Sequence, residues 1–165
     1  LARMLEAGED PRFIARRLVI FASEDVGNAD PRALQLAVAC KEAVGFVGMP
    51  EGFYPLSQCT AYLAVAPKSN ASGAAYGRAL KAVRRHGALP VPLHIRNAPT
   101  SLMQELGYAE DYQYPHDHED GFVTEEYLPE KLRGTRFYRP TDRGLEIKIG
   151  EKLARLREAK RKRRD

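Results

Sequence analysis

Proline and glycine divide residues 30–87 into three apolar stretches, each of helical length. The first opens with Asp30 and Pro31, which is typical of a helix start. The carboxylate accepts hydrogen bonds from free first-turn amides, and proline has no amide to leave unpaired. The breaks lie at residues 48–50, Pro67 and Gly87. The pattern predicts three successive helices with short connections, and therefore an all-α domain.

The first of these helices is apolar over more than half of its circumference. Its apolar side chains occupy several faces, and they are Leu34, Leu36, Ala37, Val38, Ala39, Cys40, Ala43, Val44, Phe46 and Val47. Such a helix is expected to be buried on most sides. Gly48 suits the left-handed turn that ends it, and Pro50 fits the first turn of the next helix.

The second and third helices carry narrower stripes. In the second, apolar residues recur at helical spacing at Leu56, Cys59, Leu63 and Ala66. Ser69 is predicted to cap the third, whose stripe is Tyr76, Leu80 and Val83. Gly73 and Gly77 lie four residues apart on another face of that helix. Because glycine costs about 1 kcal/mol relative to alanine in a helix, the pair predicts either close approach of a second backbone or a loosened helix.

The flanking segments predict further helices and one irregular region. Asp10 and Pro11 repeat the helix-start signal. Residues 102–106 are predicted to form a short helix capped by Thr100 or Ser101, and the aromatic, acidic residues 108–129 predict an ordered but irregular cover. Thr141 is predicted to open a last helix, with an apolar stripe at Leu145, Ile149, Leu153 and Leu156.

Length and composition limit the possible classes of protein. The 165 residues suffice for one domain with a core, and 44% apolar with 29% charged residues is typical of a soluble globular protein. No window approaches the roughly 18 consecutive apolar residues of a membrane span. No signal-peptide pattern is present, so we expect a cytoplasmic protein without a membrane partner. Because residues 1–7 are predicted to be helical, we expect a fragment of a longer protein.

The positive charge is concentrated at the C-terminal end. The formal net charge is +4, and residues 152–165 hold eight Lys or Arg against two acidic residues. The rest of the chain is close to neutral, which argues against a broad nucleic-acid surface on it. The basic tail, residues 157–165, has three interpretations: binding of phosphate backbones, contact with an acidic partner, or a solubilising end. The candidate DNA-binding residues are Lys160, Arg161, Lys162, Arg163 and Arg164.

Candidate catalytic chemistry is sparse. The chain contains no Gly-rich phosphate loop, so nucleotide hydrolysis is not expected of it. His116 and His118, beside three carboxylates in residues 117–120, are candidate metal ligands. The favoured alternative is a solvated acidic loop. Cys40 and Cys59 lack metal-type spacing and are predicted to be buried free thiols. No catalytic, cofactor-binding or firm metal-binding residue is therefore predicted.

Several phrases, taken together, identify a family resemblance. They are Leu-Ala-Arg-Met-Leu-Glu-Ala-Gly-Glu-Asp-Pro (1–11), Ala-Ser-Glu-Asp-Val-Gly-Asn-Ala-Asp-Pro (22–31), Gly-Met-Pro-Glu-Gly (48–52), Ala-Pro-Lys-Ser-Asn (66–70), Tyr-Gln-Tyr-Pro-His-Asp (112–117) and Phe-Tyr-Arg-Pro-Thr-Asp-Arg-Gly (137–144). The chain is similar, from residue 1 to about 156, to the C-terminal region of the replication-associated recombination protein A family. These AAA+ ATPases are also called MgsA and are related to the Werner-helicase-interacting ATPase.

The resemblance implies a clamp-loader collar-like helical domain that joins subunits as a homotetramer, followed by a family-specific extension. We expect the oligomerisation core at residues 1–87 and the extension at 88–165. The resemblance also implies an upstream module that binds ATP and magnesium and acts on DNA at stalled replication forks. Nucleoid association and contact with single-stranded-DNA-binding protein are further expectations. The alternative function is DNA binding or partner docking through the basic tail.

Overall fold

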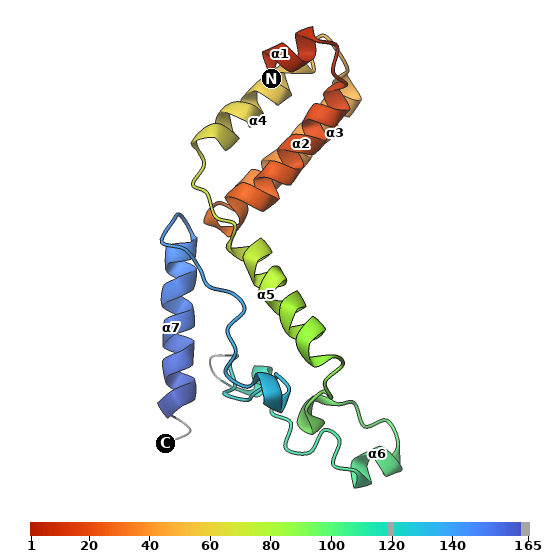
Figure 1. Cartoon of the computed structure of the whole chain (residues 1–165), viewed down its shortest axis with the longest axis vertical. Helices are drawn as coiled ribbons and strands as arrows, with labels where there is room; N and C mark the ends of the chain where they lie inside the picture. The colour runs from red at the N-terminus through yellow and green to blue at the C-terminus, as the bar shows by residue number, and fades with distance from the viewer. Residues whose placement is uncertain (119–120, 163–165) are drawn as a thin grey trace. The chain divides into compact units, whose positions relative to one another are not determined.

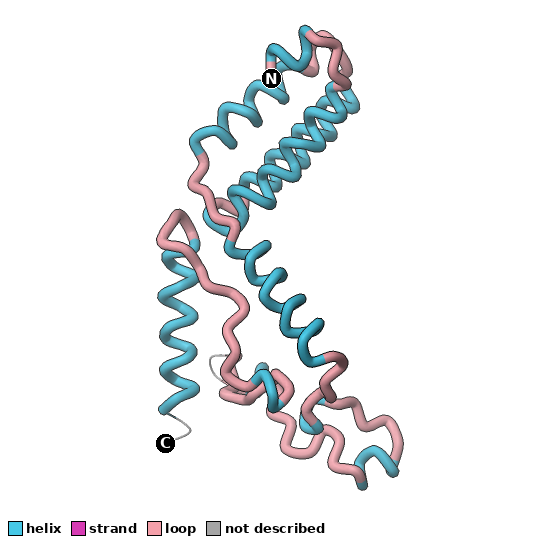
Figure 2. Tube along the Cα trace, in the orientation of Figure 1, coloured by secondary structure: helices cyan, strands magenta, loops and turns pink. Residues whose placement is uncertain are grey.

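The computed structural model describes residues 1–118 and 121–162, and every regular element in these ranges is helical (Figures 1 and 2). The α-helices are α1 (Ala2–Glu6), α2 (Pro11–Phe21), α3 (Arg32–Val47), α4 (Phe53–Val65), α5 (Ala71–His86), α6 (Ser101–Glu105) and α7 (Glu146–Lys162). A π-helical turn, Ala22–Val26, continues α2, and 3₁₀ turns lie at Gly27–Ala29, Leu93–Ile95, Pro115–Asp117 and Glu130–Leu132. The predicted all-α class is confirmed. Within the described ranges, no helix is both long enough and apolar enough to cross a membrane.

The chain forms two compact units. The first unit comprises Leu1–Arg78 with Tyr138–Glu151, and the second comprises Ala79–Phe137 with the helical residues from Lys152 onward. Both α5 and α7 begin in the first unit and end in the second. The predicted boundary at residue 87 concerns where an oligomerisation core ends, and it stays a prediction.

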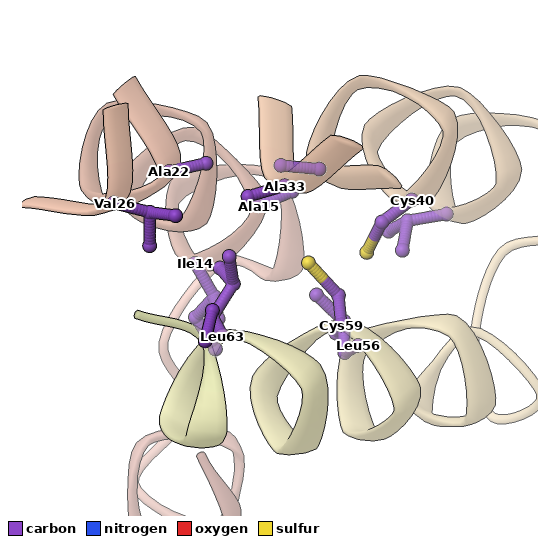
Figure 3. Close-up of a cluster of buried hydrophobic side chains, with 12 residues drawn as sticks. Ile14, Ala15, Ala22, Val26, Ala33, Cys40, Leu56, Cys59 and Leu63 are labelled. Atoms are coloured by element: carbon purple, nitrogen blue, oxygen red, sulfur yellow. The ribbon is translucent and has the colours of Figure 1, made fainter. Parts of the chain in front are cut away.

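The core of the first unit lies between α2, α3 and α4 (Figure 3). Leu56 and Leu63 of α4 are almost completely buried, and burying a leucine contributes roughly 1.5–3 kcal/mol. The buried side chains of α2 and α3 include three alanines, Ala15, Ala33 and Ala37. Small side chains let two helix axes come close together.

The predicted close approach at Gly73 and Gly77 is wrong for the described chain. A Cβ built on either glycine would meet no atom within 4 Å. Tyr76 and Val83 of the same helix are also exposed. Close packing in this unit is instead provided by the alanines of α2 and α3.

Carboxylates set the predicted helix starts. Asp10 accepts a hydrogen bond from the Arg12 amide at 2.8 Å. Asp30 accepts from the Arg32 amide at 3.3 Å and from its Nε at 3.0 Å, and also from the Tyr62 hydroxyl of α4. Burial raises the pKa of Asp30, but the hydrogen bonds from Tyr62 and Arg32 outweigh burial and leave the pKa below its usual value. Asp30 therefore joins the start of α3 to α4.

Two predicted helix starts are wrong. Pro50 lies in a turn before α4, after a cis Met49–Pro50 peptide bond, and the Gly52 amide closes that turn on the Gly48 carbonyl at 2.7 Å. The last helix begins at Glu146, five residues after Thr141. A turn at Gly144, with φ +53°, precedes it. The short helix capped by Thr100 is confirmed, since the Thr100 hydroxyl accepts from the Met103 amide at 3.3 Å.

Both cysteines are buried free thiols, as predicted. Burial raises the pKa of Cys59 to about 12 and also raises the pKa of Cys40, whose thiol donates to the Pro55 carbonyl at 3.2 Å. Because the thiolate is the reactive form, we expect neither thiol to react with Ellman's reagent at pH 8 in the native protein. Both should react once urea unfolds the chain. Rapid reaction of the native protein would contradict this burial.

Candidate self-association surface

The outward face of α4 carries no charge. Leu56, Cys59 and Leu63 point into the core, and the opposite side of the helix is exposed. This exposed side, here named the α4 face, consists of Phe53, Tyr54, Ser57, Gln58, Ala61, Ala64 and Val65. Tyr54 and Val65 are 64% and 84% exposed. Outward helix faces normally bear charged or polar residues, so a face of this composition is a candidate interaction surface.

The lack of charge extends along the sequence. The 25 residues from Phe53 to Gly77 contain a single charged side chain, Lys68. Its ammonium donates to the carbonyls of Leu63 (2.8 Å) and Ala66 at the end of α4. The one cation of this stretch is therefore bonded to backbone at the end of the helix.

The end of α3 adds further apolar surface. Phe46 is 93% exposed, and Val47 and Met49 are about half exposed. The prediction that α3 is buried on most sides is wrong for a single chain, because only one side of the helix meets α2 and α4. That buried side consists of Ala33, Ala37, Cys40 and Val44.

The candidate metal ligands lie in the second unit. His116 belongs to the 3₁₀ turn Pro115–Asp117, and its ring centroid lies 5.0 Å from that of Tyr114. His118 follows the turn. Within the described ranges, no three His, Cys, Asp or Glu side chains gather as a possible metal site. Residues 119 and 120, the other carboxylates of the candidate loop, lie outside the described ranges.

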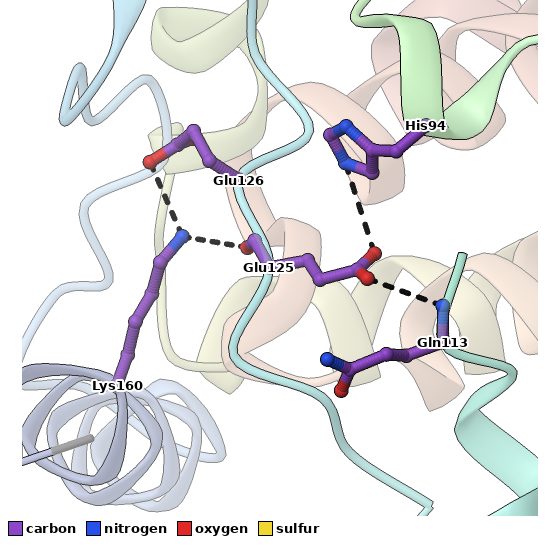
Figure 4. A network of polar contacts seen from close by, with 5 residues as sticks. All are labelled: His94, Gln113, Glu125, Glu126 and Lys160. Atoms are coloured by element: carbon purple, nitrogen blue, oxygen red, sulfur yellow. Dashed lines mark hydrogen bonds and ion pairs between the residues drawn. The ribbon is translucent and has the colours of Figure 1, made fainter. Parts of the chain in front are cut away.

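Lys160 of the basic tail joins a polar network within the second unit (Figure 4). Its ammonium donates to the Glu125 carbonyl at 2.7 Å and to the Glu126 carboxylate at 3.2 Å. The Glu125 carboxylate accepts from the Gln113 amide at 3.1 Å and lies 3.7 Å from Nε2 of His94. Lys160 therefore connects the last turns of α7 to the segment that precedes Tyr127.

The other predicted DNA-binding residues have fewer contacts. Lys162 pairs with Glu158, one turn earlier in α7, at 3.0 Å. Arg161 is exposed. Arg163 and Arg164 lie outside the described residues. Of the predicted DNA-binding residues that the structure describes, Lys160 is bonded within the chain, and Arg161 and Lys162 lie at the surface.

Sequence reasoning missed the buried carboxylate of the first unit, Glu146. It is 0% exposed and accepts from Tyr138 (2.6 Å), from Ser69 (2.7 Å), and from the amide and hydroxyl of Thr141 (2.7 and 2.8 Å). Asn28 donates to the Tyr138 hydroxyl at 3.2 Å. Burial raises the pKa of Glu146, but these hydrogen bonds outweigh it and lower the pKa. We name these five residues the Glu146 junction.

The Glu146 junction is structural. It joins residues 138–146 to the chain before α5. The predicted stripe residue Leu145 is exposed. Ser69 also accepts from the Ala71 amide at 3.2 Å, which agrees with its predicted capping role. No local pattern marks Glu146, because Ser69 lies 77 residues earlier.

This chain is similar to one part of several longer known proteins. The family model described as "MgsA AAA+ ATPase C terminal" matches residues 1–157. The chain is 53% identical over 154 residues to replication-associated recombination protein A of Coxiella burnetii, covering 93% of this chain and 35% of that protein. With the Escherichia coli K12 protein of the same name, identity is 51% over 158 residues, or 95% and 35% of the two chains. With ATPase WRNIP1 of Dictyostelium discoideum, it is 48% over 137 residues, or 82% and 16%.

Proposed function

This chain belongs to the MgsA AAA+ ATPase C-terminal family, and from that premise we propose that it joins copies of a longer AAA+ ATPase as a homotetramer. The match confirms the resemblance seen in the sequence phrases. The chain spans about a third of the length of the first bacterial relatives, at 35% of each. Their names concern replication-associated recombination, which supports a role of the longer protein in maintaining and recombining DNA at replication forks.

The uncharged α4 face is the observation that carries this proposal. Burying a large apolar side chain contributes roughly 1.5–3 kcal/mol, and a stable interface buries about 800 Å² on each partner. The α4 face and the end of α3 together offer Phe46, Tyr54 and Val65, each more than half exposed. No charge has to be desolvated when the α4 face is covered. A second copy of the chain is therefore a favourable occupant.

Catalysis is assigned to another part of the longer protein. This chain lacks the Gly-rich sequence that would cradle the phosphates of ATP. We place ATP and magnesium binding upstream of it. We further propose that the longer protein contacts single-stranded-DNA-binding protein and associates with the nucleoid. In this arrangement, the domain positions ATPase modules relative to one another and leaves hydrolysis to them.

Replacing Ala61 with glutamate tests the proposal. Ala61 lies near the middle of the α4 face and is exposed. An unpaired carboxylate buried in an interface costs on the order of 3–5 kcal/mol, so we expect the dissociation constant to rise at least about 100-fold. Sedimentation equilibrium of the chain and the variant measures this change. The unchanged chain should have the mass of four copies.

Ala154→Glu is the matched control. Ala154 is exposed on α7, where charged residues surround it in sequence, and the change in side chain is the same. This variant should assemble like the unchanged chain. A chain that is monomeric at tens of micromolar contradicts the proposal. Equal assembly of the two variants contradicts the assignment to α4, provided that their urea midpoints show both to be folded.

The second candidate function is DNA binding through the basic end of α7. The observation that favours it is the excess of cations in the last turn of α7, at Lys160, Arg161 and Lys162. Lys160 contributes less than its charge suggests, because its ammonium already binds Glu126. The exposed arginine is better placed for an incoming phosphate.

A further inference from the structure

A basic groove lies beside the last turns of α7 in the second unit. It has a volume of about 380 Å³, which is within the range of small-ligand sites, roughly 300–1,000 Å³. Three separate segments of that unit line it: a residue before Tyr127, the loop after the 3₁₀ turn Glu130–Leu132, and α7. The lining residues are Glu126, Gly134, Thr135, Arg136, Arg157, Lys160 and Arg161.

The groove has a surplus of positive charge. Four cations and one carboxylate line it, and the carboxylate, Glu126, is bonded to Lys160. Within the described ranges, no ion pair includes Arg136 or Arg157. Arg157 is also half-buried. Cations gathered in a concave surface raise the local potential and attract an anion.

The residue types favour a phosphate as that anion. A guanidinium presents a planar fork of donors that matches phosphate oxygens in pairs. Thr135 adds a hydroxyl to the lining. No aromatic side chain lines the groove, so it lacks the stacking platform by which proteins hold unpaired bases. The groove is therefore suited to a backbone phosphate and not to recognition of a base.

The C-terminal end of a helix disfavours a bound anion, and the cations that line this groove offset that effect. The C-terminal end of a helix carries partial negative charge, which would repel a phosphate beside the last turn of α7. Lys160, Arg161 and Lys162 all lie in that turn. Arg136 lies in a different segment, so its positive charge in the groove does not come from α7. The groove is thus more than the charged end of α7.

We propose that Arg136 and Arg157 bind a backbone phosphate of nucleic acid in this groove, without regard to base sequence. The proposal gives the second candidate function a defined site and is independent of self-association through the α4 face. It adds Arg136 and Arg157 to the predicted DNA-binding residues and moves the main contact away from residues 162–164. Binding follows the counterion-release law, in which each phosphate contact steepens the dependence of affinity on salt by about one unit of slope.

The test compares Arg157→Gln with Arg155→Gln. Two residues apart on a helix are roughly 200° apart around its axis, so Arg155 lies on the other side of α7 and outside the groove. Fluorescence anisotropy with a mixed-sequence single strand and its duplex, from about 50 to 200 mM salt, gives the slope of log affinity against log salt. We expect Arg157→Gln and Arg136→Gln to reduce the slope by about 1, and Arg155→Gln to change it by less than half as much.

Further experiments distinguish phosphate binding in the groove from binding by the end of the tail and from binding of an acidic protein. In a chain that ends at Lys162, Arg157→Gln should still reduce the slope of log affinity against log salt. Loss of that reduction would mean that residues after 162 make the phosphate contact. Equal slopes for the two variants, or no measurable binding of either nucleic acid, overturn the proposal. Displacement of the DNA by polyglutamate at equal charge would overturn it in favour of an acidic protein partner. The Ala61→Glu variant, assayed in parallel, shows whether self-association fails separately.

Discussion

Replacing Glu146 with alanine is expected to lower the free energy of unfolding by about 3 kcal/mol or more, because each buried hydrogen-bond donor left without an acceptor costs about 1–3 kcal/mol. The carboxylate is fully buried and accepts hydrogen bonds from Tyr138, Ser69 and Thr141. Alanine leaves their donors without acceptors and opens a cavity at the start of α7. Urea unfolding followed by circular dichroism measures the loss.

Glu151→Ala is the control for this prediction. Glu151 is exposed in the same helix, and surface substitutions of this kind usually change stability by less than about 0.5 kcal/mol. Glu146→Gln keeps an acceptor oxygen and should fall between the two. If Glu146→Ala cost no more than Glu151→Ala, the Glu146 junction would contribute nothing to stability.

The pKa of Glu146 sets how this difference depends on pH. Burial raises the pKa, but the hydrogen bonds of the junction outweigh it, so the folded pKa lies below the unfolded one. A carboxylate of this kind contributes stability that is fully present above its unfolded pKa, about 4.3, and is lost as pH falls through the folded pKa. The difference between the native chain and Glu146→Ala should therefore be largest near neutrality and shrink below about pH 4.3.

The helix starts that sequence predicted correctly depend on neighbouring residues. Asp10 and Thr100 each cap an amide two or three residues away, so a short window contains the whole interaction. The inward stripe of α4 was also predictable, because Leu56, Cys59 and Leu63 repeat with the period of the helix. For α4, local periodicity was therefore sufficient to identify the buried side of the helix.

The predictions that failed needed information about distant residues. Apolar residues around α3 show that its surface avoids water, but not whether its own chain covers that surface. The sequence analysis did not single out Glu146, since Ser69 and Asn28 are remote in sequence. The sequence predicted only part of the groove. Arg157 belongs to the predicted basic tail, but Arg136 reaches the same groove only through folding.

Gly144→Ala is expected to destabilise the chain by about 3 kcal/mol or more, the sum of backbone strain and a lost buried hydrogen bond. Gly144 has φ +53°, a conformation that costs an L-residue about 1–2 kcal/mol. A Cβ there would overlap the Ala29 carbonyl oxygen and lie 2.9 Å from Cγ of Pro67. The backbone would have to move away from Ala29. That movement would break the 2.8 Å hydrogen bond from the Leu145 amide to the same carbonyl, leaving a buried acceptor unpaired at about 1–3 kcal/mol.

Gly87→Ala separates the two contributions. Gly87 ends α5 with φ +68°, and a Cβ there would meet no atom within 4 Å. Its replacement therefore carries only the backbone strain, about 1–2 kcal/mol. The excess cost of Gly144→Ala in urea unfolding measures the contact between the Gly144 turn and Ala29. Equal losses in free energy of unfolding for the two variants would mean that the contact between the Gly144 turn and Ala29 adds nothing to stability. The Glu146 junction would then be what attaches residues 138–146 to the first unit.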